Sequence, residues 1–350
     1  MTTAQTPLAQ AVNISKRFQK KTDFAERAAI AIGAMAKPPV VHALDDVSLE
    51  IHKGEVVGLV GESGCGKSTL GRIMAGMLAP TEGTVLRDGA DVARLKGRDQ
   101  RAMRLRTQII FQDPMSSLNP RRRVGDIIGE APRFHGLVDK AGQEKLVAEL
   151  LETVGLQPEM AQRFPHQFSG GQRQRIGIAR ALAVNPDFLV CDESIAALDV
   201  SIQAQIINLF MELRERLGLT LLFISHDLSV VQHISDRVVI MYLGRVVETA
   251  PVDRIFEAPN HPYTRALLDE IPRIDRRHRS FASIRGEIPS PVNPPKGCHF
   301  HPRCPHAFDR CRVERPQLKT LEAGHESACH LNDLPPSQQP LKREENHETL

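Results

Sequence analysis

A glycine-rich segment constrains the fold of this chain more than any other feature of its sequence. Residues 61–68 read Gly-Glu-Ser-Gly-Cys-Gly-Lys-Ser and fit the pattern G-x-x-x-x-G-K-[ST]. The apolar run 55–60 before them predicts a short buried strand, and a helix is predicted from Lys67 to about Met77. A strand, a glycine loop and a helix in this order are typical of a phosphate-binding loop in an α/β fold. The alternative is a glycine turn that matches the pattern by chance.

The residue types in this loop suit the binding of nucleotide phosphates. Glycines let successive backbone N–H groups converge on phosphate oxygens, and the following helix presents its positive end to the same anion. Lys67 is expected to contact the β- and γ-phosphates, and the Ser68 hydroxyl is expected to ligate Mg²⁺. The residues predicted to contact the nucleotide here are Gly61, Glu62, Ser63, Gly64, Cys65, Gly66, Lys67, Ser68 and Thr69.

Two carboxylates end the apolar run 188–191, which predicts another buried strand. Asp192 at the end of that strand suits the Mg²⁺ shell. Glu193 can reach a water in line with the γ-phosphate and act as general base. An acidic pair after a strand is by itself more often a surface turn, but its combination with the phosphate loop favours a catalytic site.

A second glycine pair follows a serine in residues 168–174, Phe-Ser-Gly-Gly-Gln-Arg-Gln. Ser169 and these glycines at a helix N-terminus can form another anion site, where an ordinary capped helix is the alternative. The segment resembles the signature motif of ATP-binding-cassette (ABC) ATPases, which implies that two subunits packed head to tail offer this site to each other's γ-phosphate. The residues predicted to contact ATP in this way are Ser169, Gly170, Gly171 and Gln172.

This resemblance implies a particular architecture and further site residues. The expected fold is an α/β ABC-type P-loop ATPase with a RecA-like parallel sheet, an antiparallel β subdomain and a helical subdomain at about 120–184. Gln112 matches the loop that contacts Mg²⁺ and water and links the site to membrane subunits, and His226 matches the switch histidine near the γ-phosphate. The implied catalytic set is Lys67, Gln112, Glu193 and His226, and the implied Mg²⁺ ligands are Ser68, Gln112 and Asp192.

Two further positions follow from the same resemblance. Asp199 matches the loop that crosses the dimer interface, although taken alone it would be an ordinary surface residue. Phe18 best matches the aromatic residue that stacks on adenine, with ordinary core packing as the alternative. An unusually long segment, residues 19–42, separates Phe18 from the next strand.

The chain departs from the family directly after its acidic pair. The family usually has proline, threonine and serine there, and this chain has Ser194, Ile195 and Ala196. None of these changes removes a group expected to hold phosphate, metal or water, so we expect a competent hydrolytic site.

Residues 111–120 and 124–128, followed by 261–268 and 286–289, look like the ATP-binding subunits of dipeptide and oligopeptide importers. The implied function is ATP hydrolysis that powers the import of di- or oligopeptides. The implied partners are two membrane-spanning permease subunits, a second ATPase subunit that is identical or homologous, and an extracytoplasmic substrate-binding protein. Nickel, glutathione or another small solute is the alternative cargo. A soluble ABC ATPase of translation or repair is a remote alternative, since the chain has one cassette and no heptad array.

Composition sets the remaining expectations. A net charge of +3 over 350 residues gives no argument for nucleic acid. No run approaches the roughly 18 apolar residues that span a bilayer, and residues 1–10 do not resemble a secretory signal. We therefore expect a peripheral protein at the cytoplasmic face of the inner membrane. The predicted divisions are a nucleotide-binding domain at 1–259, a small Cys-rich extension at 260–334, and a disordered tail at 335–350.

Four cysteines crowd the extension: Cys298, Cys304, Cys311 and Cys329. Four thiolates can hold a tetrahedral Zn²⁺ or a cubane iron–sulfur cluster. The gaps of five, six and seventeen residues are wider than the paired spacing usual for zinc ribbons. The pattern resembles the C-terminal region of the peptide-importer family, some members of which hold a [4Fe–4S] cluster there. A [4Fe–4S] cluster is therefore the first expectation, and zinc or metal-free thiols are the alternatives.

Overall fold

The computed structural model describes residues 6–113, 117–270, 284 and 286–335. Residues 114–116 of the importer-like segment and all but the first residue of the predicted tail lie outside these ranges. The described chain contains two sheets, an eight-stranded one with the order β11-β12-β10-β9-β3-β8-β7-β6 and a four-stranded one with the order β2-β1-β4-β5.

The centre of the larger sheet is parallel. β9 and β8 flank β3, and β7 and β6 follow beside β8, each pair in parallel register. Every residue of β3, β7 and β8 is buried, as expected for strands covered on both faces. These strands are β3 (Val56–Val60), β6 (Thr107–Ile110), β7 (Phe188–Asp192), β8 (Thr220–Ser225) and β9 (Arg237–Tyr242). The predicted parallel α/β core is confirmed.

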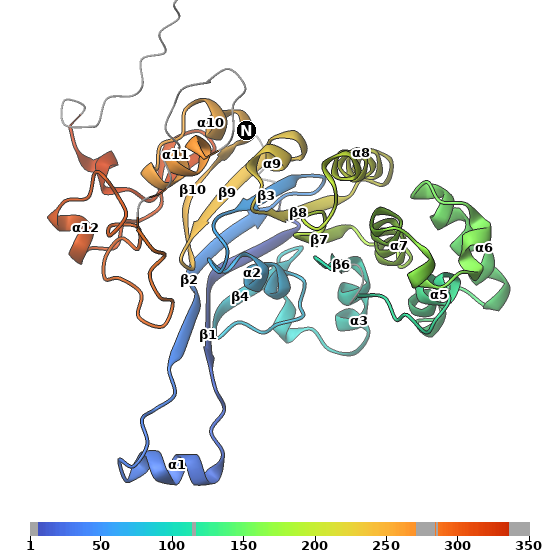
Figure 1. The fold of residues 1–350 in the computed structure, drawn as a ribbon, viewed down its shortest axis with the longest axis horizontal. Coiled ribbons are helices and arrows are strands. Elements are labelled where there is room, and N and C mark those ends of the chain that lie inside the picture. The colour runs from blue at the N-terminus through green and yellow to red at the C-terminus, as the bar shows by residue number, and fades with distance from the viewer. Residues whose placement is uncertain (1–5, 114–116, 271–283, 285, 336–350) are drawn as a thin grey trace, which may run out of the picture.

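The smaller sheet is antiparallel and lies over helix α2 (Lys67–Met74) (Figure 1). Leu70 and Ile73 of α2 are fully buried in one apolar cluster together with residues from both sheets. The helix ends at Met74, three residues earlier than predicted, where Gly76 takes a positive φ of 70°. The strands are β1 (Ala9–Gln19), β2 (Val40–Ile51), β4 (Glu82–Arg87) and β5 (Ala90–Asp91).

Two helices connect the parallel strands and pack in a second apolar cluster. Phe210 of α8 (Val200–Leu217) meets Phe223 of β8 edge to face, with ring centroids 6.1 Å apart. α9 (Leu228–Ile234) buries Val231 and Ile234 in the same cluster. Both faces of the parallel sheet are thereby covered, which holds the carboxyl ends of its strands in fixed positions.

A helical region follows β6 and stands at one end of the molecule (Figure 1). It contains α5 (Val124–Phe134), α6 (Lys140–Thr153), the short turns η2 (Pro158–Gln162) and η3 (Pro165–Gln167), and α7 (Gly170–Leu182). α5 packs against both α6 and α7. α3 (Gly97–Arg106) and η1 (Val92–Arg94) lie before this region, between β5 and β6.

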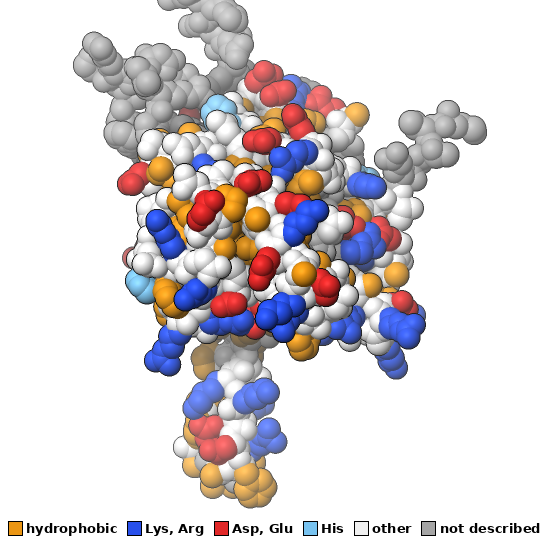
Figure 2. Space-filling model, turned by 90° about the vertical axis from the view of Figure 1, so that its right-hand side faces the viewer, with side chains coloured by type: hydrophobic (Ala, Val, Ile, Leu, Met, Phe, Trp, Pro, Cys, Tyr) orange, Lys and Arg blue, Asp and Glu red, His pale blue; other side chains and the backbone are white. Residues whose placement is uncertain are grey.

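The long segment after Phe18 forms an arm that projects away from the body (Figure 1). β1 and β2 stay paired out to Gln19 and Val40, and α1 (Phe24–Ala31) lies at the far end. Phe24 and Ile32 are 88% and 81% exposed, and Figure 2 shows apolar atoms gathered at the tip. The arm thus extends the antiparallel sheet, and none of its side chains that the structure describes joins either apolar cluster.

The C-terminal region packs against the end of the molecule opposite the helical region (Figure 1). β10 pairs with β9 and also with β12, so strand pairing crosses the predicted boundary near Pro259 and extends the core sheet. The elements are β10 (Arg245–Pro251), α10 (Val252–Glu257), α11 (Pro262–Asp269), α12 (Asp309–Val313), β11 (Lys319–Glu322), β12 (His325–Ser327) and η4 (His330–Asp333).

Candidate functional site

The glycine loop lies between β3 and α2, as predicted, and two of its glycines are required by close backbone approach. A Cβ on Gly61 would lie 2.2 Å from the Met241 carbonyl oxygen, and one on Gly66 would lie 2.4 Å from the Ala43 carbonyl oxygen. Gly66 also has a φ of 105°, a backbone conformation that residues other than glycine rarely adopt. The loop is therefore pressed against neighbouring backbone, while Ser63 and Gly64 remain exposed.

Lys67 is buried in this loop, with 4% of its surface exposed. Its ammonium donates hydrogen bonds to the carbonyl oxygens of Gly61 at 2.7 Å and of Glu62 at 3.0 Å. A buried ammonium needs such acceptors. Phosphate oxygens at the mouth of the loop can compete for the same three N–H donors.

The two predicted carboxylates lie where β7 ends. Asp192 is 4% exposed, and its Oδ1 accepts a hydrogen bond from the Ser68 hydroxyl at 2.6 Å. Arg72, one helical turn after Ser68, places its guanidinium 3.8 Å from Asp192 Oδ2. Hydroxyl and carboxylate oxygens side by side are the donor types that Mg²⁺ prefers, so this pair fits a magnesium ion.

Glu193 has an unusual backbone. Its φ is +47°, and its N–H donates to the Ile224 carbonyl of the neighbouring strand at 3.0 Å. A non-glycine residue in this region costs about 1–3 kcal/mol and is held there by its surroundings. Its carboxylate accepts a hydrogen bond from Gln112 Nε2 at 2.8 Å and lies 3.7 Å from His226 Nδ1. The structure thus brings Gln112, Glu193 and His226 together from the ends of three parallel strands.

Three residues replace the usual family sequence after the acidic pair, and two of them, Ser194 and Ile195, are buried. Ile195 is 3% exposed and belongs to the larger apolar cluster, and Ser194 is 1% exposed. Neither Ser194 nor Ile195 takes part in the hydrogen bonds from Ser68 to Asp192 or from Gln112 to Glu193. The departure from the family sequence therefore leaves those contacts in place.

Ser169 caps α7 with a reciprocal pair of hydrogen bonds. Its Oγ accepts from the Gln172 N–H at 3.3 Å, and Gln172 Oε1 accepts from the Ser169 N–H at 3.0 Å. A Cβ on Gly171 would lie 2.5 Å from Ile202 of α8, which explains why glycine is needed there. Ser169 and Gly170 face solvent. The helix N-terminus is therefore formed and accessible, on a different part of the chain from the glycine loop.

The two remaining predicted contacts are also exposed. Phe18 lies on β1 opposite Val41, is 41% exposed, and has the Lys16 ammonium 5.2 Å from its ring centroid. This exposure argues against a role in core packing. Asp199 precedes α8 and is exposed, with its backbone carbonyl accepting from Gln203 N–H at 2.8 Å. The functional roles of Phe18, Asp199 and the other site residues remain predictions.

The four C-terminal cysteines are free thiols, and electrostatic interactions link Cys329 to the other three. Burial raises the pKa of Cys304 to about 11 and that of Cys329 to about 12, and the neighbouring thiols add to both shifts. The Cys298 N–H also donates to the Cys311 carbonyl at 2.9 Å. Within the described residues, however, no group of three or more His, Cys, Asp or Glu side chains could hold a metal ion. The predicted metal site is not confirmed.

Two residues of the C-terminal region contact the glycine loop and were not predicted as part of the site. The Glu62 N–H donates to Tyr263 Oη at 2.9 Å, and the Glu62 carboxylate pairs with Arg303. Tyr263 belongs to the importer-like segment 261–268, which was the one available indication. Arg72 was also missed, although its spacing of four residues from Ser68 places both on one face of a helix.

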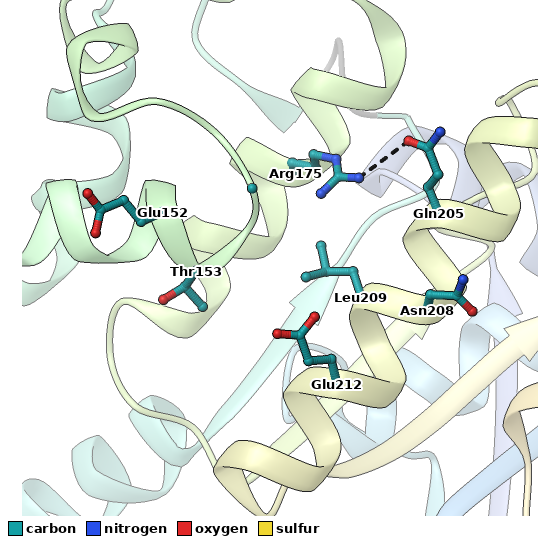
Figure 3. Close-up of a pocket in the computed structure, with 8 residues that line it drawn as sticks. Glu152, Thr153, Arg175, Gln205, Asn208, Leu209 and Glu212 are labelled. Carbon is teal, nitrogen blue, oxygen red and sulfur yellow. Dashed lines mark hydrogen bonds between the residues drawn. The ribbon is translucent and has the colours of Figure 1, made fainter.

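A hollow lies elsewhere in the described structure. It has a volume of about 410 Å³ and lies between α6, the start of α7 and α8 (Figure 3). Arg175 crosses it, donating to the Val154 carbonyl at 2.6 Å and to Gln205 Oε1 at 3.5 Å. None of the predicted site residues lines it, so it has no part in the site.

Comparison with known proteins now identifies the family. A family description, ABC transporter, matches residues 44–196, and a second, oligopeptide/dipeptide transporter C-terminal region, matches residues 247–311. A protein of Sinorhizobium fredii named probable peptide ABC transporter ATP-binding protein y4tS is 52% identical over 84% of this chain and 83% of its own length. The chain belongs to the ATP-binding proteins of ABC transporters. It is an ABC-type ATPase, and the site described above fits ATP and Mg²⁺.

Other comparisons agree with this ABC ATPase assignment. The oligopeptide transport ATP-binding protein AppF of Bacillus subtilis is 51% identical over 83% of this chain and 90% of its own length. Among solved structures, the ATP-binding cassette MJ0796, as a dimer in a post-hydrolysis state bound to ADP and Pi, is 28% identical with a TM-score of 0.58. The match covers 70% of this ABC ATPase and 98% of MJ0796. Among the helices of the described chain, none is long and apolar enough to cross a membrane.

Proposed function

We propose that this ABC ATPase hydrolyses ATP to power the import of di- or oligopeptides through an ABC transporter. The observation that carries the proposal is the meeting of Ser68 with Asp192 and of Gln112 with Glu193 at the ends of parallel strands. The peptide cargo is supported by the match of residues 247–311 to the oligopeptide/dipeptide transporter C-terminal region and by the names of the relatives.

Each residue of the site has a proposed role in hydrolysis. The glycine loop and Lys67 hold the phosphates of ATP, and Phe18 stacks on the adenine. Ser68, Gln112 and Asp192 hold Mg²⁺, which offsets negative charge on the phosphates when it is bound. Glu193 takes a proton from the attacking water, and His226 lies on the γ-phosphate side. The hydrogen bond from Gln112 fixes the orientation of the Glu193 carboxylate.

A complete transporter needs partners. We propose two permease subunits, a second ATPase subunit that closes on ATP through Ser169, Gly170, Gly171, Gln172 and Asp199, and an extracytoplasmic substrate-binding protein. The surface of residues 120–165 is the proposed docking site for a permease helix. This arrangement places the chain at the cytoplasmic face of the inner membrane, attached through its partners.

We keep a [4Fe–4S] cluster at Cys298, Cys304, Cys311 and Cys329 as a proposal of lower rank. Supporting it, burial and the neighbouring thiols of Cys298, Cys304 and Cys311 raise the pKa of Cys329, and the four cysteines are not paired in disulfides. Iron, sulfide and zinc analysis after anaerobic purification tests this. Metal-free protein with full ATPase activity would remove the proposal.

The experiment for the proposed function uses the complete transporter, copurified through this subunit and reconstituted in lipid. ATP hydrolysis is measured with and without short peptides and the binding protein. We expect permease subunits to copurify and peptides to stimulate hydrolysis. Copurified permeases without peptide stimulation would contradict the peptide cargo and favour nickel or another solute. The absence of any membrane partner would contradict the transport role.

A further inference from the structure

The side chains of three other residues hold Glu62, the second residue of the glycine loop. The Glu62 N–H donates to Tyr263 Oη at 2.9 Å, and its carbonyl accepts from the Lys67 ammonium at 3.0 Å. Its two carboxylate oxygens accept from Arg303 Nη1 at 2.7 Å and Nη2 at 3.0 Å. Two of these three partners belong to the C-terminal region, 201 and 241 positions away in the sequence.

The ion pair between Arg303 and Glu62 is well shielded from water. The side chain of Arg303 is 5% exposed and that of Glu62 is 20% exposed. The pairing is bidentate, a geometry that fixes both the position and the orientation of a carboxylate. Removing one partner leaves a charge that is shielded from water without its main counter-ion, so loss of the pair should be costly.

Aromatic residues hold both C-terminal partners firmly against the core sheet. Tyr263 packs on Tyr242 at the end of β9, with ring centroids 4.7 Å apart, and Phe300 lies 5.2 Å from Tyr242 and 5.3 Å from Tyr263. All three are at most 1% exposed. The Arg303 guanidinium lies 5.9 Å from the Tyr242 ring centroid. Tyr263 and Arg303 therefore contact the loop from a rigid support.

The contact from Lys67 differs from those of Tyr263 and Arg303 because Lys67 is also proposed to bind the phosphates. In the proposed function, ATP phosphates compete for its ammonium, which at present donates to Gly61 and Glu62. When the phosphates take that ammonium, the contacts from Tyr263 and Arg303 remain, together with the Cys65 N–H that donates to the Glu62 carbonyl at 3.3 Å. A hydrogen bond from the Gly244 N–H to the Cys65 carbonyl, at 2.9 Å, holds the middle of the loop.

We propose that Tyr263 and Arg303 are positioning residues through which the C-terminal region holds the phosphate loop in its ATP-binding shape. This inference rests on the proposed assignment of residues 61–69 to the phosphates of ATP. It gives the C-terminal region a role in the nucleotide site itself. Neither residue touches the phosphates; both act through Glu62.

The test measures Mg-ATP affinity and thermal stability of the full chain in four variants: Arg303→Gln, Glu62→Gln, the double variant and Arg303→Lys. We expect Arg303→Gln and Glu62→Gln each to weaken ATP binding roughly 10-fold, because small shifts of positioning groups cost large factors. The double variant should be no weaker than the more affected single variant, since both changes remove one interaction. Arg303→Lys should recover part of the affinity through a single charged contact.

Arg254→Gln is the matched control. Arg254 of α10 pairs with Glu322 of β11, so it also links two segments of the C-terminal region by an ion pair, but it does not touch the loop. We expect its ATP affinity to match the unchanged chain. Tyr263→Phe removes only the hydroxyl and keeps the aromatic packing, so it serves if the Arg303 variants fail to fold. We expect it to weaken ATP binding roughly threefold, the loss of one neutral hydrogen bond.

Lys67→Ala separates this inference from the proposed function. If Lys67→Ala binds ATP as tightly as the unchanged chain, the loop assignment itself is wrong. If Lys67→Ala loses affinity while Arg303→Gln and Tyr263→Phe stay within twofold of the unchanged chain, the positioning role alone is overturned. A fall in thermal stability with unchanged ATP affinity would likewise assign Arg303 a purely structural part.

Discussion

The phosphate loop and the signature segment, residues 168–174, differ in where their polar groups find partners. The loop and its neighbours are linked to one another across the fold: Ser68 to Asp192, Gln112 to Glu193, and Glu62 to Arg303. The signature segment instead satisfies its cap internally, through the reciprocal bonds of Ser169 and Gln172, and presents its helix N-terminus to solvent.

In the proposed function, this difference means that one chain contains one assembled half-site and one half-site that a second subunit completes. Residues from four distant parts of the sequence converge at the loop, where binding and chemistry are proposed. At the signature segment no such convergence occurs among the hydrogen bonds above, and the exposed helix N-terminus can serve an anion held by another subunit. Changes in the two regions are therefore expected to have separable effects.

The largest separable effect is expected from Lys67→Ala. The change removes the charged donors proposed for the phosphates, and we expect ATP affinity of the isolated chain to fall about 10- to 100-fold. Equilibrium nucleotide binding measures it. Hydrolysis should fall with it. If the isolated chain kept its affinity for ATP, the phosphate loop would not be the assembled half-site.

A smaller and different effect is expected from Ser169→Ala. Loss of the cap should lower the free energy of unfolding by about 1 kcal/mol. Hydrolysis by the assembled transporter should fall roughly 10-fold from the loss of one transition-state donor, while ATP affinity of the isolated chain stays the same. Turnover and binding assays on the same variant measure the two quantities.

Asp91→Ala is the control for that cap. Asp91 accepts from the Ala93 N–H at 2.9 Å and caps a short turn outside the proposed site. Asp91→Ala should lower the free energy of unfolding by about as much as Ser169→Ala and leave hydrolysis unchanged. An equal loss of hydrolysis in both cap variants would mean that Ser169 acts through stability alone.

The smallest effect on either half-site is expected from a change in the buried pair of His325 and Glu248. His325 Nε2 of β12 lies 2.8 Å from Glu248 Oε1 of β10. The hydrogen bond to Glu248 raises the pKa of His325. Burial works to raise the pKa of Glu248, but hydrogen bonds from His325 and the Asn260 and His261 N–H groups outweigh it, so this pKa is lowered.

These directions set a pH window for stability. The His325 contribution is fully present below the ordinary histidine pKa of about 6.5 and is lost as pH rises through its higher folded value. The Glu248 contribution is present above the ordinary carboxyl pKa and is lost as pH falls through its lower folded value. We expect His325→Gln to lower the melting temperature most near pH 5.5 and less near pH 9. Thermal unfolding across pH measures this, and a pH-independent difference would contradict it.

Local patterns made most of the fold and the assembled half-site predictable. The glycine loop, the buried strands before Gly61 and Asp192, and the cap at Ser169 are all encoded within a few neighbouring residues. Ser68 was predicted from the glycine-loop pattern and Asp192 and Glu193 from the end of a buried strand, whereas Gln112 was predicted from the family resemblance.

Other features depend on contacts between distant segments, which a local pattern does not contain. Arg303 meets Glu62 across 241 positions, and nothing near Arg303 marks it as a partner of the loop. The positive φ of Glu193 follows from its backbone bond to Ile224 on the next strand. The segment after Phe18 was seen only as unusually long, because the pairing that extends β1 and β2 into an arm is itself non-local.

The central claim is that this chain is an ATPase whose assembled half-site uses Glu193 to activate water. The most direct test is ATP turnover by the lipid-reconstituted transporter containing Glu193→Gln, with bound nucleotide measured in the same sample. We predict that turnover falls at least about 100-fold while ATP remains bound, because only the general base is removed. Turnover close to that of the unchanged transporter would contradict the account.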